Sequence, residues 1–212
     1  MRTFILALLL GAIPLQARAA AIANGVDEPP RRGTYVETSL GVFTTMGGSV
    51  GLSNGQPYLS MTLGHELGEQ ATVFFSLGIG AASASCYAKY DASTGICSLG
   101  ADSFGATFVE GGVSYGLPIV ARTLLSLKMV AGLTDLSPAP VEDGSTVGNH
   151  LFGFHLGTGL SIDYDTHLEH FAVGFDALFR YTLAHYTPST TGVAQTLGLP
   201  SLAVMPRVRY VF

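Results

Sequence analysis

Hydrophobic and polar residues alternate along most of this chain, with apolar side chains at every second position of several segments. Successive side chains of an extended strand point to opposite faces, so the alternation predicts β-strands with one apolar and one more polar face. Most of these segments have about the 9–11 residues that a tilted membrane-spanning strand requires. We predict strands at residues 34–45, 58–65, 70–80, 104–117, 124–133, 151–164, 170–182 and 202–212.

The connections between these segments alternate in length. Short connections cover residues 66–69, 118–123 and 165–169, and long ones cover residues 46–57, 81–103, 134–150 and 183–201. Short turns at one end and long loops at the other are typical of up-and-down barrels of bacterial outer membranes. The pattern therefore predicts an all-β fold: a transmembrane up-and-down antiparallel β-barrel of eight strands, with both termini periplasmic.

The charged residues within the predicted strands lie on the face opposite the more apolar one. An arginine or lysine facing lipid at mid-membrane would cost roughly 2–4 kcal/mol, so we expect the apolar face outside and the charges inside. The predicted interior charge network consists of Glu37, Glu110, Lys128, Asp176, Arg180, Arg207 and Arg209. A structural plug is the favoured interpretation, because side chains about fill an eight-stranded interior. Proton or ion conduction is the alternative.

The last predicted strand must pair with the first to close the barrel. Glu37 lies near the start of the first strand, and Arg207 and Arg209 lie near the end of the last. We therefore predict that Glu37 faces one of these arginines across the seam. Pro206 lacks a backbone N–H, and its position within the strand predicts a β-bulge.

Composition and the N-terminus both indicate export. The chain is 48% hydrophobic and only 12% charged, which is low in charge for a soluble protein. Residues 1–23 predict a secretory signal peptide, cleaved after Ala19 or Ala23, because a basic start precedes a short apolar run and small residues. This run is too short for a membrane anchor. Residues 24–33 form a polar lead-in, and residues 34–212 form the barrel.

An exported protein meets an oxidising environment, in which we predict a disulfide between Cys86 and Cys97. A metal or redox site is the alternative, but the two residues lack CxxC spacing and have no neighbouring histidine. The same predicted loop carries Tyr87, Lys89 and Tyr90, which favour a recognition surface. The net charge of −5 argues against a nucleic-acid partner.

The histidines and acidic residues could form a metal site or a catalytic site. His167 and His170, with Asp165 and Glu169, surround one predicted turn, whereas His150 belongs to the opposite edge of the membrane. We interpret the turn residues as solvated, and no metal or cofactor is expected. Asp135, Glu142 and Asp143 form an acidic patch in a long loop; a solvated loop is favoured over a divalent-cation site.

A barrel hydrolase would need a serine, a histidine and a carboxylate within hydrogen-bond reach. Ser161 and His155 share the inward face of one predicted strand, but at roughly 20 Å apart they cannot touch. The chain contains no G-x-S-x-G motif. We therefore predict that the protein is not an enzyme.

The features together resemble the small outer-membrane β-barrels whose familiar members are the transmembrane domains of major surface antigens. Tyr115, Tyr164, Tyr210 and Phe212 point outward at predicted periplasmic ends, where an aromatic girdle belongs. Tyr210 and Phe212 match the terminal signal of these proteins, although Met205 and Arg207 replace the usual polar residue and glycine. The resemblance implies a Gram-negative outer membrane, contact with its lipid and lipopolysaccharide, and insertion by the barrel-assembly machinery.

A second resemblance rests on short motifs. Arg32-Gly33-Thr34-Tyr35, Gly41-x-Phe43 and the segment LGHELG at residues 63–68 look like outer-membrane barrels associated with gliding motility. This resemblance implies a place in an envelope-spanning motility complex, with other envelope proteins as partners.

Three functions follow from this reading of the sequence. The first is a non-enzymatic anchoring, assembly or surface-binding component of the cell envelope. The alternative is a small transporter or channel for hydrophobic or small polar solutes. An outer-membrane lipid hydrolase comes third.

Overall fold

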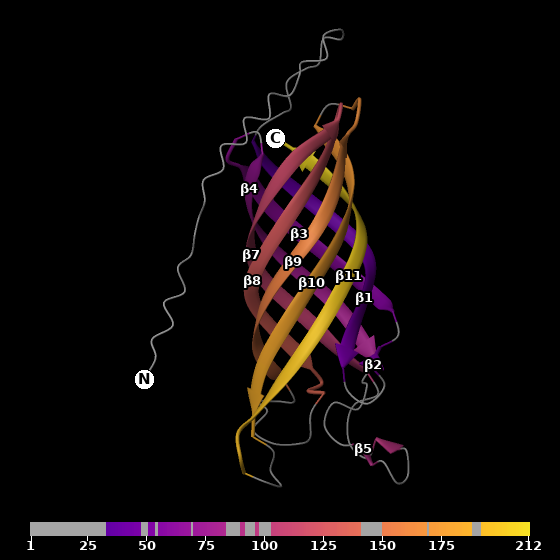
Figure 1. The fold of residues 1–212 in the computed structure, drawn as a ribbon, viewed down its shortest axis with the longest axis vertical. Helices are drawn as coiled ribbons and strands as arrows, with labels where there is room; N and C mark the ends of the chain where they lie inside the picture. Colours follow the sequence, from indigo (N-terminus) through magenta and orange to yellow (C-terminus); the bar gives the residue numbers. More distant parts are fainter. Residues whose placement is uncertain are drawn as a thin grey trace, which may run out of the picture.

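The protein forms a closed antiparallel β-barrel, with the C-terminus at one end and β5 near the other (Figure 1). The computed structural model describes residues 33–47, 51–53, 55–68, 70–83, 90–91, 96–97, 103–140, 150–168, 170–187 and 192–212. The predicted signal peptide and nearly all of the lead-in lie outside these ranges. None of the described residues forms a helix long and apolar enough to cross a membrane.

Eight long strands make up the ring, and each is paired with the next. They are β1 (Thr34–Gly47), β3 (Gln56–Glu66), β4 (Ala71–Ser83), β7 (Ser103–Val120), β8 (Thr123–Ser137), β9 (Leu151–Asp165), β10 (Phe171–Tyr186) and β11 (Gln195–Val211). Three two-residue strands lie in the connections: β2 (Gly51–Leu52), β5 (Tyr90–Asp91) and β6 (Ile96–Cys97). β11 pairs with both β10 and β1, so the ring has no free edge. The predicted eight-stranded barrel is confirmed.

The seam between β1 and β11 shows how Pro206 is accommodated. The register is the same at both ends of the ladder, from Tyr35 opposite Val211 to Thr45 opposite Ser201. The pairs that Leu40 and Gly41 would form with Pro206 and Met205 are missing from the ladder. The predicted bulge is therefore wrong: the proline interrupts the ladder without inserting a residue.

Gly41 explains why the strands stay in register at this point. A Cβ atom at Gly41 would lie only 2.1 Å from the carbonyl oxygen of Val204. Because glycine has no such atom, the two strands approach closely beside the proline and need not bend apart.

The outer wall carries a band of exposed apolar side chains. Leu40, Met61 and Leu133 are 62–64% exposed. Along their strands, outward residues of this kind alternate with buried inward residues. Phe171, Tyr210 and Phe212 lie at the periplasmic end, where the rings pack edge to face at 5.1 and 5.2 Å. An apolar band that ends in aromatic residues fits a bilayer.

Several strands extend beyond their predicted ends on the extracellular side. β8 continues to Ser137, β10 continues to Tyr186 and β11 begins at Gln195, so the predicted loops 134–150 and 183–201 were too long. At the periplasmic end, β7 runs through residues 118–120 of the predicted turn 118–123. A strand of 17 residues, such as β11, is about 56 Å long and rises about 40 Å when tilted, which exceeds an apolar band of about 25 Å.

The polarity of the two faces reverses in these extensions. Asp135 and His185 point outward there, whereas Leu136, Ala184 and Leu197 are buried inside. The alternation that places apolar residues on the outer face therefore ends at the membrane surface, although the hydrogen-bonded ladder continues.

Candidate functional site

The interior of the barrel is the best-defined candidate site. All seven residues of the predicted charge network point inward, and none is more than 8% exposed. They do not form one network. They fall into a lower network near the periplasmic end and an upper network toward the extracellular end.

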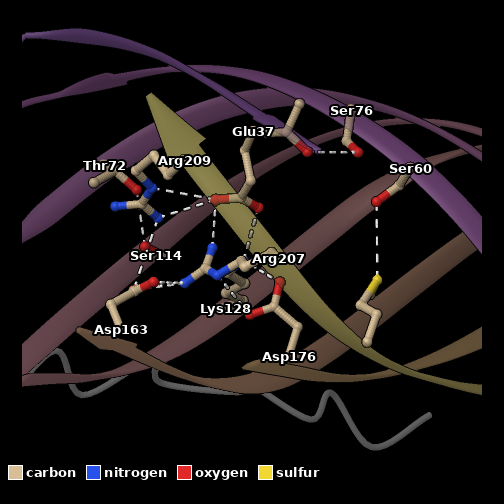
Figure 2. A network of polar contacts seen from close by, with 12 residues as sticks. Glu37, Ser60, Thr72, Ser76, Ser114, Lys128, Asp163, Asp176, Arg207 and Arg209 are labelled. Atoms are coloured by element: carbon tan, nitrogen blue, oxygen red, sulfur yellow. Dashed lines mark hydrogen bonds and ion pairs between the residues drawn. The ribbon is translucent and has the colours of Figure 1, made fainter. Parts of the chain in front are cut away.

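The lower network consists of Glu37, Lys128, Asp163, Asp176, Arg207 and Arg209 (Figure 2). Arg207 lies at its centre. Its Nη1 donates a hydrogen bond of 2.5 Å to Glu37 Oε2, and its Nη2 lies 2.5 Å from both carboxylate oxygens of Asp163. Asp163 was missing from the predicted network, although its alternation on β9 places it inward.

Arg209 and Lys128 complete the lower network. Arg209 donates from Nε and Nη2 to Glu37 Oε2 at 3.2 Å, and its guanidinium lies 4.3 Å from the ring centre of Tyr35. Lys128 Nζ lies 2.7 Å from Asp176 Oδ2 and 3.7 Å from Glu37 Oε1. Glu37 thus contacts both arginines of the closing strand across the seam, where the sequence predicted contact with one. Three carboxylates face three cations in this network, and Glu66 Oε1 lies 3.9 Å from Arg209 Nη1 at its edge.

The upper network is built around Arg180, which is 1% exposed. Its Nε and Nη2 donate to the two oxygens of Glu110 at 2.8 and 2.7 Å, and Nη2 also donates to Tyr58 Oη at 2.8 Å. The guanidinium lies 4.6 Å from the ring centre of Phe108 and 5.4 Å from that of Tyr58. This bidentate, ring-stacked geometry suits arginine and not lysine.

Glu110 also contacts a histidine and, through it, a threonine. His155 Nε2 lies 3.0 Å from Glu110 Oε2, and His155 Nδ1 lies 2.8 Å from Thr134 Oγ1. Glu110, Gly132 and His155 occupy one row of the sheet across β7, β8 and β9. Because Gly132 has no side chain, Glu110 and His155 reach each other across it.

This hydroxyl, imidazole and carboxylate follow the order of a hydrolytic triad. Thr134, His155 and Glu110 are only 1%, 0% and 2% exposed, and Arg180 holds the carboxylate from the other side. A substrate carbonyl has no access to a hydroxyl buried in this way, so the arrangement suits a structural hydrogen-bond chain. The sequence alone paired His155 with Ser161 of the same strand and did not reveal this group. Its members come from three strands, and only the register brings them together.

An apolar belt separates the two networks. It consists of Val130, Leu178, Ala203 and Met205, all at most 6% exposed. Val130 packs against the backbone of Gly157, and Leu178 packs against that of Gly159. On β10, Leu178 lies between Asp176 of the lower network and Arg180 of the upper one. On β1, β3 and β4 the buried side chains beside the belt are Ser39, Ser60 and Ser76, and Ser60 Oγ lies 3.8 Å from Met205 Sδ. The belt therefore interrupts the polar groups on β8, β10 and β11 only.

A larger apolar cluster fills the barrel around and above the upper network. Its members are buried inward residues that include Phe43, Ala82, Phe104, Ala106, Phe108, Leu136, Leu151, Ala184, Leu197 and Leu199. The rings of Phe43, Tyr58 and Phe108 contact one another at centroid distances of 5.7–6.3 Å. The extracellular end of the lumen is therefore lined by hydrocarbon.

The remaining histidines do not form one cluster. His167 Nδ1 lies 2.6 Å from Arg122 Nη1, and His170 Nδ1 lies 2.8 Å from the carbonyl oxygen of Val211. Within the part of the chain that the structure describes, no three histidine, cysteine or acidic residues are placed to share a metal ion. Glu169 lies outside that part.

Asp135, from the predicted acidic patch, pairs with His150 at the extracellular rim. The His150 Nδ1 atom lies 2.9 Å from Asp135 Oδ2, and the imidazole stacks on Phe152 at 6.1 Å. Glu142 and Asp143 lie outside the described residues, as do Cys86, Tyr87 and Lys89. Only the backbone of Tyr90 and Cys97 is described, where the two residues are paired. The Cys86–Cys97 disulfide stays a prediction.

Comparison with known proteins identifies the fold. No protein-family profile and no curated protein sequence matches the chain. Neisserial surface protein A (NspA) is similar in structure, with a TM-score of 0.56, 15% sequence identity, and coverage of 85% of this chain and 97% of NspA. The outer membrane protein AlkL, solved in lipid bilayers, has a TM-score of 0.52 and 13% identity, and covers 89% of this chain and 94% of AlkL.

These similarities identify the fold of the small eight-stranded outer-membrane β-barrels, and the apolar outer band fits a lipid bilayer. The identities are low, so the likeness concerns the fold alone. The resemblance to gliding-motility barrels gains no support from these structures.

Proposed function

We propose that the protein is a closed, non-conducting anchor in the outer membrane, which presents its extracellular loops or periplasmic turns to other envelope components. The observation that carries this proposal is the interior. Two hydrogen-bonded charge networks occupy the lumen of the described barrel, with the apolar belt of β8, β10 and β11 between them.

The energetics of the lower network favour a plug. A passing ion would have to displace Arg207 or Lys128 from buried carboxylates, and breaking one buried pair costs about 3–5 kcal/mol. The apolar belt adds a second barrier, because Val130 and Leu178 offer no ligand to a dehydrated ion. Side chains about fill the interior of an eight-stranded barrel, which leaves no continuous path of water past them.

Planar-bilayer recording tests the plug. The purified protein should show no steady conductance. A double variant, Val130→Gly with Leu178→Gly, removes two of the four side chains of the belt and should raise the frequency of transient openings, while Leu127→Gly on the lipid face of β8 serves as the control. Steady conductance from the unaltered protein would contradict the plug and favour a channel.

The binding role needs a separate experiment. Affinity purification of the tagged protein from mild detergent extracts should recover one or more envelope proteins. Recovery should fall when residues 141–149 of the extracellular connection between β8 and β9 are replaced by a glycine–serine linker of equal length. If no stable partner is recovered under any mild extraction, the anchoring role loses its main support.

A motility complex is one setting for such an anchor. A deletion strain that moves normally on surfaces would exclude it.

The end of β11 supports insertion by the barrel-assembly machinery. Tyr210 packs between Phe171 and Phe212, and Phe212 is 67% exposed at the periplasmic end. Deletion of Phe212 should lower the amount of protein in the outer membrane and leave its export to the periplasm unchanged. Equal outer-membrane levels would contradict this role.

Passage of hydrophobic solutes is the second candidate function. The observation that favours it is the apolar lining of the extracellular end, where Leu136, Leu151 and Leu199 are buried inside the barrel. An uptake defect for alkanes or aromatic hydrocarbons in a deletion strain would favour this function over the anchor. A lipid hydrolase is disfavoured by the burial of Thr134 and His155, and unchanged lipid A in the deletion strain would exclude it as a lipid A-modifying enzyme.

A further inference from the structure

Three buried polar atoms without hydrogen-bond partners belong to the lower network and its neighbour in the ladder. Ser161 Oγ, Asp176 Oδ1 and Arg207 Nε have no such partner among the residues that the structure describes. Ser161 and Asp176 stand directly opposite each other in the ladder of β9 and β10. Arg207 Nε lies 3.3 Å from Asp176 Oδ1 without forming a hydrogen bond. All three residues are at most 4% exposed.

Leaving these atoms unsatisfied would be costly. A single buried donor or acceptor without a partner is unfavourable, and a charged one more so. Folded proteins commonly satisfy such groups with a buried water molecule that makes about three hydrogen bonds. The three atoms offer complementary chemistry: the Arg207 Nε–H donates, the Asp176 oxygen accepts, and the Ser161 hydroxyl does either.

We propose that one water molecule binds between Ser161, Asp176 and Arg207. It accepts a hydrogen bond from Arg207 Nε, donates one to Asp176 Oδ1 and forms a third with Ser161 Oγ. The water joins β9, β10 and β11 at the point where Arg207 reaches past Asp176 toward Glu37 and Asp163.

The composition of the surroundings favours water over an ion. Each cation of the lower network already pairs with at least one carboxylate, and Glu66 also approaches Arg209 at 3.9 Å, so an added ion would have to compete with existing pairs. Ser126 stands opposite Ser161 on β8, so two short side chains are neighbours at this level.

The proposal can be tested by NMR on the full barrel in detergent micelles, with ¹⁵N-labelled arginine. The Arg207 Nε–H should show a nuclear Overhauser cross-peak to water, as expected for a bound molecule. A crystal structure at high resolution should show density within about 2.7–3.2 Å of the three atoms. Absence of both, or an anomalous peak at this point in crystals soaked with rubidium or bromide, would overturn the proposal.

Two matched variants separate this site from general hydration. Ser161→Val fills the position with methyl groups and should abolish the Arg207 cross-peak. Ser201→Val makes the same change at a serine of equal exposure opposite Arg180 and should leave the cross-peak intact. Should Ser161→Val fail to fold, Ser161→Ala removes one of the three partners and should weaken the cross-peak. An unchanged cross-peak in whichever of the two variants folds would overturn the proposal.

Discussion

The membrane-spanning part of the barrel and its extracellular extension solve the same packing problem with opposite polarity. In the membrane, Leu133 and Met61 face outward while Lys128 and Arg207 lie inside. In the extension, Asp135 faces outward and Leu136 lies inside. The strands and their pairing continue through both parts. The comparison shows that the medium outside the wall decides which face is apolar, because lipid accepts hydrocarbon and water accepts charge.

The two parts are also stabilised differently. Hydrogen-bonded ion pairs stabilise the membrane-spanning lumen. The low polarity of the interior strengthens these pairs, and removal of one partner leaves a buried charge without compensation. The extension is held by burial of leucine, phenylalanine and alanine away from water, as in a soluble protein. Substitutions in the two parts should therefore lower the free energy of unfolding for different reasons and by different amounts.

The largest effect is expected from Arg207→Ala in the membrane-spanning part. The substitution leaves Glu37 and Asp163 buried without their central cation, and should lower the free energy of unfolding by about 3–5 kcal/mol. Urea titration in phospholipid vesicles measures this. Arg207→Lys keeps the charge and should recover part of the loss. A loss below about 1 kcal/mol, the range of exposed pairs, would contradict a central role for Arg207.

Leu136→Ala tests the apolar core of the extension. Leu136 is fully buried, so the substitution should cost about 2–5 kcal/mol through lost burial and the cavity that remains. Leu133→Ala, three residues earlier on the lipid-facing wall, should cost less because lipid chains fill the space that the substitution leaves and no cavity remains. Equal losses for the two variants, measured by the same titration, would remove the distinction between the two parts.

Lysine substitutions on the outer wall locate the boundary between the membrane-spanning part and the extracellular extension. Met61→Lys, in the middle of β3, should cost roughly 2–4 kcal/mol, because the charge enters lipid. Ser103→Lys, at the extracellular end of β7, should be nearly neutral because the charge stays in water. A severe effect at Ser103 would mean that the membrane extends farther along the strands.

The smallest effect is expected at the rim of the extension. The Asp135–His150 pair is partly exposed, so Asp135→Asn should cost no more than about 1 kcal/mol. The difference from the unaltered protein should shrink as salt is added, because exposed charges are screened. A large, salt-independent loss would place this pair in a buried site.

Much of the wall could be predicted from sequence, and the contacts inside it only in part. Period-two alternation identified eight strands and the inward face of each, and Glu37 meets the closing-strand arginines across the seam. The strand ends beyond Leu133 and before Leu202 were missed, because the polarity of the faces reverses there. Pro206 predicted a bulge, but Gly41 on the neighbouring strand removed the need for one.

The sequence by itself determined a barrel wall, because side chains on a strand alternate whatever surrounds them. Only the tertiary structure decided which interior groups meet. Glu110 reaches His155 across Gly132, and Arg207 reaches Asp163 as well as Glu37. These contacts depend on the register and closure of all eight strands, which bring residues far apart in the chain to one level of the lumen. No local sequence pattern specifies which interior residues share a level of the lumen, since that arrangement forms only when β11 pairs with β1.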